Sequence, residues 1–239
     1  MSCAYSVIIP AYDEEQTIAR AVRETSKVFF RLNKPFEIIV VDDGSTDRTA
    51  AVVTTLMSSI PELILMRHGR NMGKGVAVRT GVEKAHGDIF LFLDADLATH
   101  PSDFLSFIPA FRTADIVIAS RSARGTTIAE RQPIFRVLAG KIFNLFAVRW
   151  YLGLPYHDTQ CGFKAFTRKT KPLFRDMRTS GWAFDVELLM RARRAGYRIT
   201  ERPVTWRHGR DSKVRLADVW QIVRELREMK QESGKELAK

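Results

Sequence analysis

Short runs of consecutive apolar residues recur along the first half of the chain and predict the strands of a buried sheet. They read SVIIP (6–10), EIIVVDD (37–43), LILMRH (63–68), IFLFLDAD (89–96) and ADIVIASR (114–121). Helical stretches lie between them, at about residues 13–30, 46–57 and 73–85. Continuous apolar strands that alternate with crossover helices are typical of a parallel sheet covered on both faces. The pattern therefore predicts an α/β domain with a mostly parallel central sheet.

Four aspartates, Asp42, Asp43, Asp94 and Asp96, directly follow these apolar runs. We expect them at the carboxyl edge of the sheet, where open α/β folds bind ligands. Side chains two residues apart leave a strand on the same side, so Asp94 and Asp96 can converge on one hard cation. Such cations share carboxylates with substrate phosphates, which predicts Mg²⁺ or Mn²⁺ on a nucleotide diphosphate. The alternative, ordinary turn or helix-cap chemistry, stays open and is as strong as the ligand role for Asp47.

A glycine-containing segment, NMGKG at residues 71–75, suits a phosphate at the start of a helix. It is not a Walker A loop, because Gly75 follows Lys74 where that loop needs Ser or Thr. The first strand is not followed by Gly-x-Gly-x-x-Gly either. A dinucleotide-binding dehydrogenase is therefore disfavoured.

Two further segments predict helices with an apolar face. Residues 132–154 have one narrow polar stripe, but charges interrupt them and the longest uncharged stretch is 142–148. A membrane span needs about 20 apolar residues, so this helix is expected to be buried or to lie in a membrane interface. The second, from residue 216, has apolar positions that fit packing on the domain or, alternatively, membrane binding. Residues 233–239 are expected to fray.

Charge is unevenly distributed in this sequence. The net charge is +11, and residues 121–215 hold 21 Lys and Arg against 7 Asp and Glu. Such a field suits a polyanion, an anionic bilayer or a phosphorylated substrate. Cys3 and Cys161 form neither a disulfide framework nor a zinc pattern, and no signal peptide precedes the first strand. A reducing, cytoplasmic location is expected.

Six blocks in order resemble inverting family 2 glycosyltransferases of GT-A fold, which is a Rossmann-like fold for nucleotide-diphospho-sugars. They are SVIIPAYDEEQTI, IIVVDDGSTDRT, RNMGKGVAVRTG, FLDADLATHP, DTQCGFKAFTR and WAFDVELLMRARRAGYRI, between about Tyr5 and Arg215. The resemblance is strongest to members that transfer glucose or mannose to dolichyl phosphate. It implies one catalytic domain at residues 1–215, followed by a C-terminal amphipathic helix and tail at residues 216–239.

The resemblance also implies a donor site. It places the base and ribose in a pocket that follows the first two strands, the cation on Asp94 and Asp96, and a mobile loop over the phosphates. The residues assigned to the donor are Pro10, Tyr12, Glu14, Val41, Asp43, Lys74, Asp94, Ala95, Asp96, Arg207 and Lys213.

For the acceptor, the resemblance implies a polyprenyl phosphate gripped by Arg121 and Arg136, because Arg can hold phosphate bidentately. The expected catalytic set is thus Asp94, Asp96, Arg121 and Arg136. Asp158 and Asp185 are candidates for orienting the sugar or the acceptor, without an assigned base.

The expected sugar follows from two departures between branches of the family. Ala98 stands where mannosyl enzymes carry Gln, and DTQCGFK at residues 158–164 resembles the glucosyl branch. UDP-glucose is the preferred donor, with GDP-mannose as the alternative. A lipid acceptor further implies peripheral association with the cytoplasmic face of a membrane, through the basic region and residues 132–154.

Two rival interpretations stay in view. One is a transferase on the same scaffold that uses another sugar or a soluble acceptor. The other is a basic nucleic-acid-binding domain, which the net charge would suit. No helix-turn-helix, RNA-recognition or finger motif is recognisable, and the acidic edge would repel phosphates without a metal. Nucleic acid is therefore not expected as a partner.

Overall fold

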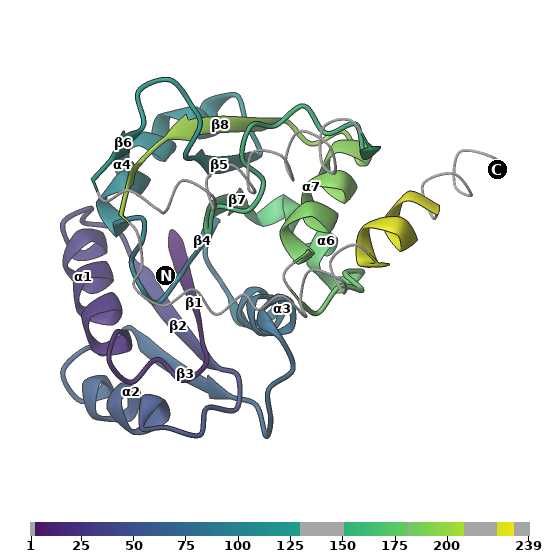
Figure 1. Cartoon of the computed structure of the whole chain (residues 1–239). Coiled ribbons are helices and arrows are strands. Elements are labelled where there is room, and N and C mark those ends of the chain that lie inside the picture. Colours follow the sequence, from purple (N-terminus) through teal and green to yellow (C-terminus); the bar gives the residue numbers. More distant parts are fainter. Residues whose placement is uncertain (1–2, 130–150, 182, 208–223, 232–239) are drawn as a thin grey trace.

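The computed structural model describes residues 3–129, 151–181, 183–207 and 224–231. Within them, a seven-stranded sheet of order β3-β2-β1-β4-β7-β5-β8 runs through the middle of the molecule (Figure 1). All five predicted strands are present in this sheet. Its strands are β1 Tyr5–Ala11, β2 Phe36–Asp42, β3 Leu63–Arg67, β4 Ile89–Leu93, β5 Ile116–Ser120, β7 Phe163–Thr167 and β8 Ile199–Pro203.

The sheet is mostly parallel, as predicted, with β7 as the exception. This strand lies antiparallel between β4 and β5, whereas the other paired strands of the sheet are parallel. A second, two-stranded sheet pairs β6 Thr127–Ile128 with β9 Thr205–Trp206. Because β7 runs backwards, its first residue lies beside the end of β4: Phe163 pairs with Leu93.

Helices cover both faces of the sheet (Figure 1). Strand residues alternate between two apolar layers, so that Val7 and Ile9 pack on one side and Ile8 on the other. One layer contains residues of α1 Ile18–Phe30, α2 Thr49–Met57 and α4 Phe104–Phe107. The opposite layer contains residues of α3 Lys74–Lys84, α6 Pro172–Arg175 and α7 Phe184–Arg194.

The order of the strands reverses at β1. From β1 the chain moves outward through β2 to β3, and it then returns through α3 to β4 on the other side of β1. Accordingly α3 lies on the sheet face opposite to α1 and α2. Ligands of open α/β sheets bind at such a reversal, outside the carboxyl ends of the strands. The fold thus predicts a site at the ends of β1 and β4.

The first two helices begin later than the sequence predicts, at Ile18 rather than residue 13 and at Thr49 rather than residue 46. Polar side chains of the preceding residues bind the neighbouring loop instead of continuing the helix. Asp13 has a φ of 49°, and its Oδ1 accepts a hydrogen bond of 2.8 Å from the Thr46 amide. Side chains of Asp, Ser and Thr compete with helical hydrogen bonds in this way.

Residues 224–231 are helical, and Leu226 and Met229 are buried in the same layer as α3 and α7. This part of the predicted C-terminal helix therefore packs on the domain, while the boundary at residue 216 stays a prediction. The predicted apolar helix at 132–154 lies mostly outside the described residues, because the description of the chain resumes only at Tyr151. In the described ranges, no helix has the length and apolar character needed to cross a bilayer.

Aromatic rings join β4, β7 and α6 in the centre of one layer, which allows a test of the fold. Phe166 stacks on Phe90 with 5.4 Å between ring centroids and meets Phe174 edge-on at 5.2 Å. Phe166→Ala should lower the free energy of unfolding by about 3–5 kcal/mol, because it leaves a cavity. Urea denaturation would measure this change. Phe30→Ala is the control: that side chain is 75% exposed, and a change within about 0.5 kcal/mol is expected. Equal effects would contradict the assigned core.

Candidate active site

The ends of β1, β2, β4 and β5 bring the predicted polar residues to one edge of the sheet. Ala11, the last residue of β1, pairs with Asp42 at the end of β2, and Ile8 pairs with Phe92 of β4. Asp94 follows two residues after Phe92, at the same edge. Parallel strands thus do what the sequence pattern predicts and bring acidic residues from separate segments together.

Asp94 sits in a space that only glycine leaves open. Its amide donates a hydrogen bond of 3.1 Å to the carbonyl of Gly162, the residue before β7. A Cβ atom on Gly162 would overlap the Asp94 carboxylate. Asp94 and Gly162 are 68 residues apart in sequence and meet through the backbone and the carboxylate. Glycine is required at position 162 because a side chain would not fit beside the carboxylate.

Asp96 is the second carboxylate of the pair. Its Oδ1 accepts a hydrogen bond of 2.9 Å from the Ala98 amide. Loss of solvation and the charge of Asp94 raise the pKa of Asp96 above its ordinary value. Neighbouring carboxylates offer oxygen ligands to a hard cation, and Mg²⁺ or Mn²⁺ fits such a pair when phosphates complete its shell. Among the described residues, no group of three or more His, Cys, Asp or Glu is placed to hold a metal ion.

Lys74 extends from the start of α3 to the first carboxylate. Its Nζ lies 2.5 Å from Asp94 Oδ1. The turn before it is held by Asp43, whose carboxylate accepts hydrogen bonds from the Met72 and Gly73 amides at 2.9 and 2.8 Å. Gly73 has a φ of 98°, a conformation that disfavours other residues. The predicted phosphate loop is therefore a fixed turn that points Lys74 at the acidic pair.

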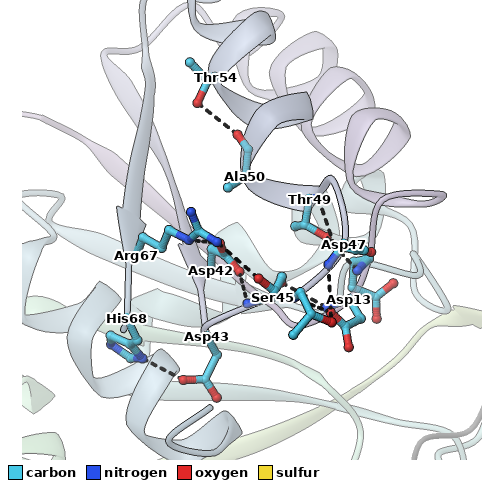
Figure 2. Close-up of polar contacts among 12 residues, drawn as sticks. Asp13, Asp42, Asp43, Ser45, Asp47, Thr49, Ala50, Thr54, Arg67 and His68 are labelled. Atoms are coloured by element: carbon cyan, nitrogen blue, oxygen red, sulfur yellow. Dashed lines mark hydrogen bonds and ion pairs between the residues drawn. The ribbon is translucent and has the colours of Figure 1, made fainter. Parts of the chain in front are cut away.

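Asp43 and Asp42 also anchor the loop that follows β2 (Figure 2). Asp43 Oδ1 lies 2.6 Å from His68 Nδ1. Asp42 is fully buried, accepts from the Ser45 amide at 2.9 Å and pairs with Arg67 Nε at 3.0 Å. Both carboxylates are thus engaged within the protein, and the role predicted for Asp43 in a base and ribose pocket stays a prediction.

The other residues predicted to bind the donor base and ribose lie around the end of β1 and beside it. Pro10 is half-buried near the end of β1, and Val41 of β2 is fully buried. Tyr12 and Glu14 follow in the loop, where the Glu14 amide donates to Thr49 Oγ1 at 2.8 Å. Asp47 lies just before α2, and its Oδ1 accepts a hydrogen bond of 2.9 Å from the Thr49 amide. This contact agrees with the turn interpretation of Asp47, while Arg48 is the N-cap residue of the helix.

A buried ion pair lies behind the acidic pair, and its cation was not predicted. Lys164 of β7 is fully buried, and its Nζ donates to Asp185 Oδ1 and to the Cys161 carbonyl, each at 2.6 Å. Burial raises the pKa of Asp185, while the charges of Lys164 and Lys74 oppose that increase. Asp185 stands at the start of α7, so this pair fixes α7 to the turn that carries Gly162.

Arg121, directly after β5, forms a two-bond ion pair with Asp158. Its Nε and Nη2 donate to the two carboxylate oxygens at 2.6 and 2.9 Å, and its amide donates to Oδ2 at 2.9 Å. The guanidinium also lies 5.7 Å from the ring centroid of Trp206. Burial works against ionisation, but Arg121 holds the pKa of Asp158 below its usual range. The arrangement fixes the plane of the guanidinium.

Arg207 is brought to the same edge by its backbone. Its amide donates a hydrogen bond of 2.8 Å to the carbonyl of Ala98, two residues after Asp96. Trp206 beside it forms a bridge with Thr99. The backbone of Arg207 thus lies beside the loop that carries the acidic pair. Arg136 and Lys213, which were predicted to contact the phosphates, lie outside the described residues.

The basic half of the chain is divided between two edges of the sheet. Arg168 and Lys169 follow Thr167, which pairs with Ile89 at the beginning of β4. They therefore lie at the edge opposite to Asp94. Lys169 pairs there with Asp115 at 2.7 Å. From the sequence alone, the basic residues of 121–215 are expected to form a single positive field. The antiparallel β7 instead places some of them at the sheet edge away from Asp94.

Comparison with known proteins identifies the same family that the six sequence blocks resemble. The family described as "Glycosyl transferase family 2" matches residues 6–188. A dolichyl-phosphate beta-glucosyltransferase of Trichomonas vaginalis is 34% identical over 233 residues, which are 92% of this chain and 71% of the relative. The enzyme of the same name from Drosophila melanogaster is 36% identical over 224 residues, 86% of this chain and 67% of the relative.

A solved structure gives the fold. Glucosyl-3-phosphoglycerate synthase of Mycobacterium tuberculosis, in complex with Mn²⁺, UDP-glucose and phosphoglyceric acid, matches with a TM-score of 0.69. It is 22% identical, and the match covers 96% of this chain and 80% of that protein. The predicted GT-A fold is thereby confirmed.

The close approach of Gly162 to Asp94 predicts the effect of one methyl group. Gly162→Ala should displace the Asp94 carboxylate; if Asp94 is a metal ligand, as the sequence predicts, Mn²⁺ binding should weaken about 10–100-fold, because the support of the ligand is lost. Isothermal titration calorimetry would measure this. Gly69→Ala is the matched control, because a Cβ there meets nothing within 4 Å. Similar Mn²⁺ affinity in both variants would contradict the predicted role of Asp94 as a metal ligand.

Proposed function

This chain belongs to glycosyl transferase family 2 and is a glycosyltransferase, and from that premise we propose that it transfers glucose from UDP-glucose to a dolichyl-type polyprenyl phosphate. The observation that carries the proposal is the acidic pair at the sheet reversal, with Lys74 on one side and the Arg121 fork on the other. The acidic pair with Lys74 suits a cation on a diphosphate, and the Arg121 guanidinium suits a second phosphate. Relatives named dolichyl-phosphate beta-glucosyltransferase support the sugar and the acceptor.

The acidic pair would hold the donor through a divalent cation. Asp94 and Asp96 would bind Mg²⁺ or Mn²⁺, and the cation would neutralise the charge that develops on the leaving diphosphate. Lys74 and the amides at the start of α3 lie beside that position and favour an anion. Ala98, rather than a further polar ligand, follows the pair, which supports UDP-glucose over GDP-mannose as donor.

The acceptor phosphate would approach from the Arg121 side. Asp158 fixes the guanidinium by two hydrogen bonds, so the remaining N–H groups keep one direction toward the acceptor. A phosphate oxygen attacks C1 of glucose opposite the UDP group; the new C1–O bond forms as the bond to UDP breaks. The α-linked donor thus gives a β-linked lipid phosphate, and UDP leaves.

No general base is needed for this step, because an ionised phosphate is already nucleophilic. Asp158 accepts hydrogen bonds from the partly buried Arg121, and Asp185 accepts one from the fully buried Lys164. This pairing supports a positioning role for both. Catalysis would then rest on alignment of the two substrates and on charge neutralisation.

A donor and acceptor screen tests the proposal. With Mn²⁺ or Mg²⁺ and a short polyprenyl phosphate, UDP-glucose should give an organic-extractable product, and GDP-mannose at least about tenfold less. Asp94→Ala and Asp96→Ala should each lower the rate at least about 100-fold, because charge stabilisation of the leaving group is lost. Asp88→Ala, at the opposite edge, is the control. A preference for GDP-mannose would contradict the proposed donor, and a preference for a soluble acceptor would contradict the lipid acceptor. Full activity without a metal ion would contradict the metal requirement.

A lipid acceptor also requires contact with a membrane, which we propose is peripheral and on the cytoplasmic face. Residues 132–154 and the basic residues near Arg121 would provide it. The chain should then sediment with vesicles that contain phosphatidylserine at low ionic strength, and raising the salt to about 1 M should reduce this, because charge screening shortens to about 3 Å. Absence of sedimentation with anionic vesicles at low salt would argue against this mode of association.

A further inference from the structure

We propose that Lys74 is a built-in counter-ion of the metal site. In the donor-free enzyme its ammonium neutralises Asp94, and a divalent cation must displace it before it can use the same oxygen. The displaced ammonium then contacts the donor diphosphate. This inference rests on the proposed metal role of Asp94 and Asp96.

The ion pair is short and partly enclosed. Lys74 Nζ lies 2.5 Å from Asp94 Oδ1, with side-chain exposures of 19% and 33%. Enclosed charges interact more strongly than charges in water. The ammonium of Lys74 therefore already occupies one side of the Asp94 carboxylate.

The backbone of Lys74 is fixed, so only its side chain can make the exchange. The Met72 and Gly73 amides bind Asp43, and the Gly75 amide donates to the Ser180 carbonyl at 2.9 Å. The lysine stem has four carbons and carries a compact, mobile charge. The ammonium can therefore leave Asp94 while the start of α3 stays in place.

The destination of the ammonium follows from the same geometry. A divalent cation on Asp94 repels the ammonium, whereas a diphosphate beside the start of the 11-residue helix α3 attracts it. Metal and diphosphate together compensate the broken ion pair, but metal alone does not. We therefore expect weak binding of the metal by itself and strong binding of the metal with the nucleotide.

Removal of the ammonium should change the two affinities in opposite directions. Lys74→Met should bind Mn²⁺ about tenfold more tightly in the absence of nucleotide, and should bind UDP about tenfold more weakly at saturating Mn²⁺. Electron paramagnetic resonance of free Mn²⁺ would measure the first quantity, and calorimetry the second. Lys74→Arg, which keeps the charge, should stay within about threefold of the wild type for Mn²⁺.

Lys84→Met is the matched control, because it removes one positive charge from the other end of the same helix. It should leave both affinities unchanged, which separates a local exchange from a general change in charge. Mn²⁺ affinity of Lys74→Met that is unchanged or weaker would overturn the inference. Asp94→Asn distinguishes the levels of failure. Loss of Mn²⁺ binding in that variant supports the metal site itself, whereas wild-type Mn²⁺ binding would overturn both proposals.

Discussion

The reversal of strand order between β1 and β4 determines where the charged groups of this protein can lie. The chain leaves β1 toward β2 and β3, crosses beneath the sheet through α3, and returns as β4 on the other side. The parallel register of β1 with both neighbours then brings their carboxyl ends to one edge. Asp43, Lys74 and Asp94 come from segments that are far apart in sequence, and this topology is what makes them neighbours.

Neighbouring charges in a partly buried edge must be compensated, and three cations of this region each pair with a carboxylate from another segment. Lys74 of α3 pairs with Asp94 after β4, Lys164 of β7 with Asp185 of α7, and Arg121 after β5 with Asp158. Removing one partner of a buried pair leaves an uncompensated charge, which is strongly destabilising. The ion pairs therefore fix the relative positions of elements as well as the polarity of the site.

The strands and the acidic edge could be predicted because they depend on local pattern: continuous apolar runs mark buried strands, and Asp94 and Asp96 follow one directly. The later half was harder. Lys164 interrupts the apolar pattern of the antiparallel β7, and the partner that makes the burial of this lysine possible, Asp185, comes 21 residues later from a helix. The helix starts at Ile18 and Thr49 were misplaced because the loop of Asp13 binds the loop of Thr46 across the sheet edge. Such partners are not visible in local sequence.

If Asp94 and Asp96 hold a metal-bound nucleotide diphosphate at this edge, a crystal structure with Mn²⁺ and UDP will show it, with data collected at the manganese absorption edge. One anomalous peak is expected between the two carboxylates and the diphosphate, with the ammonium of Lys74 moved from Asp94 to a phosphate oxygen. Manganese at another position, or a nucleotide bound with the Lys74–Asp94 pair intact, would contradict it.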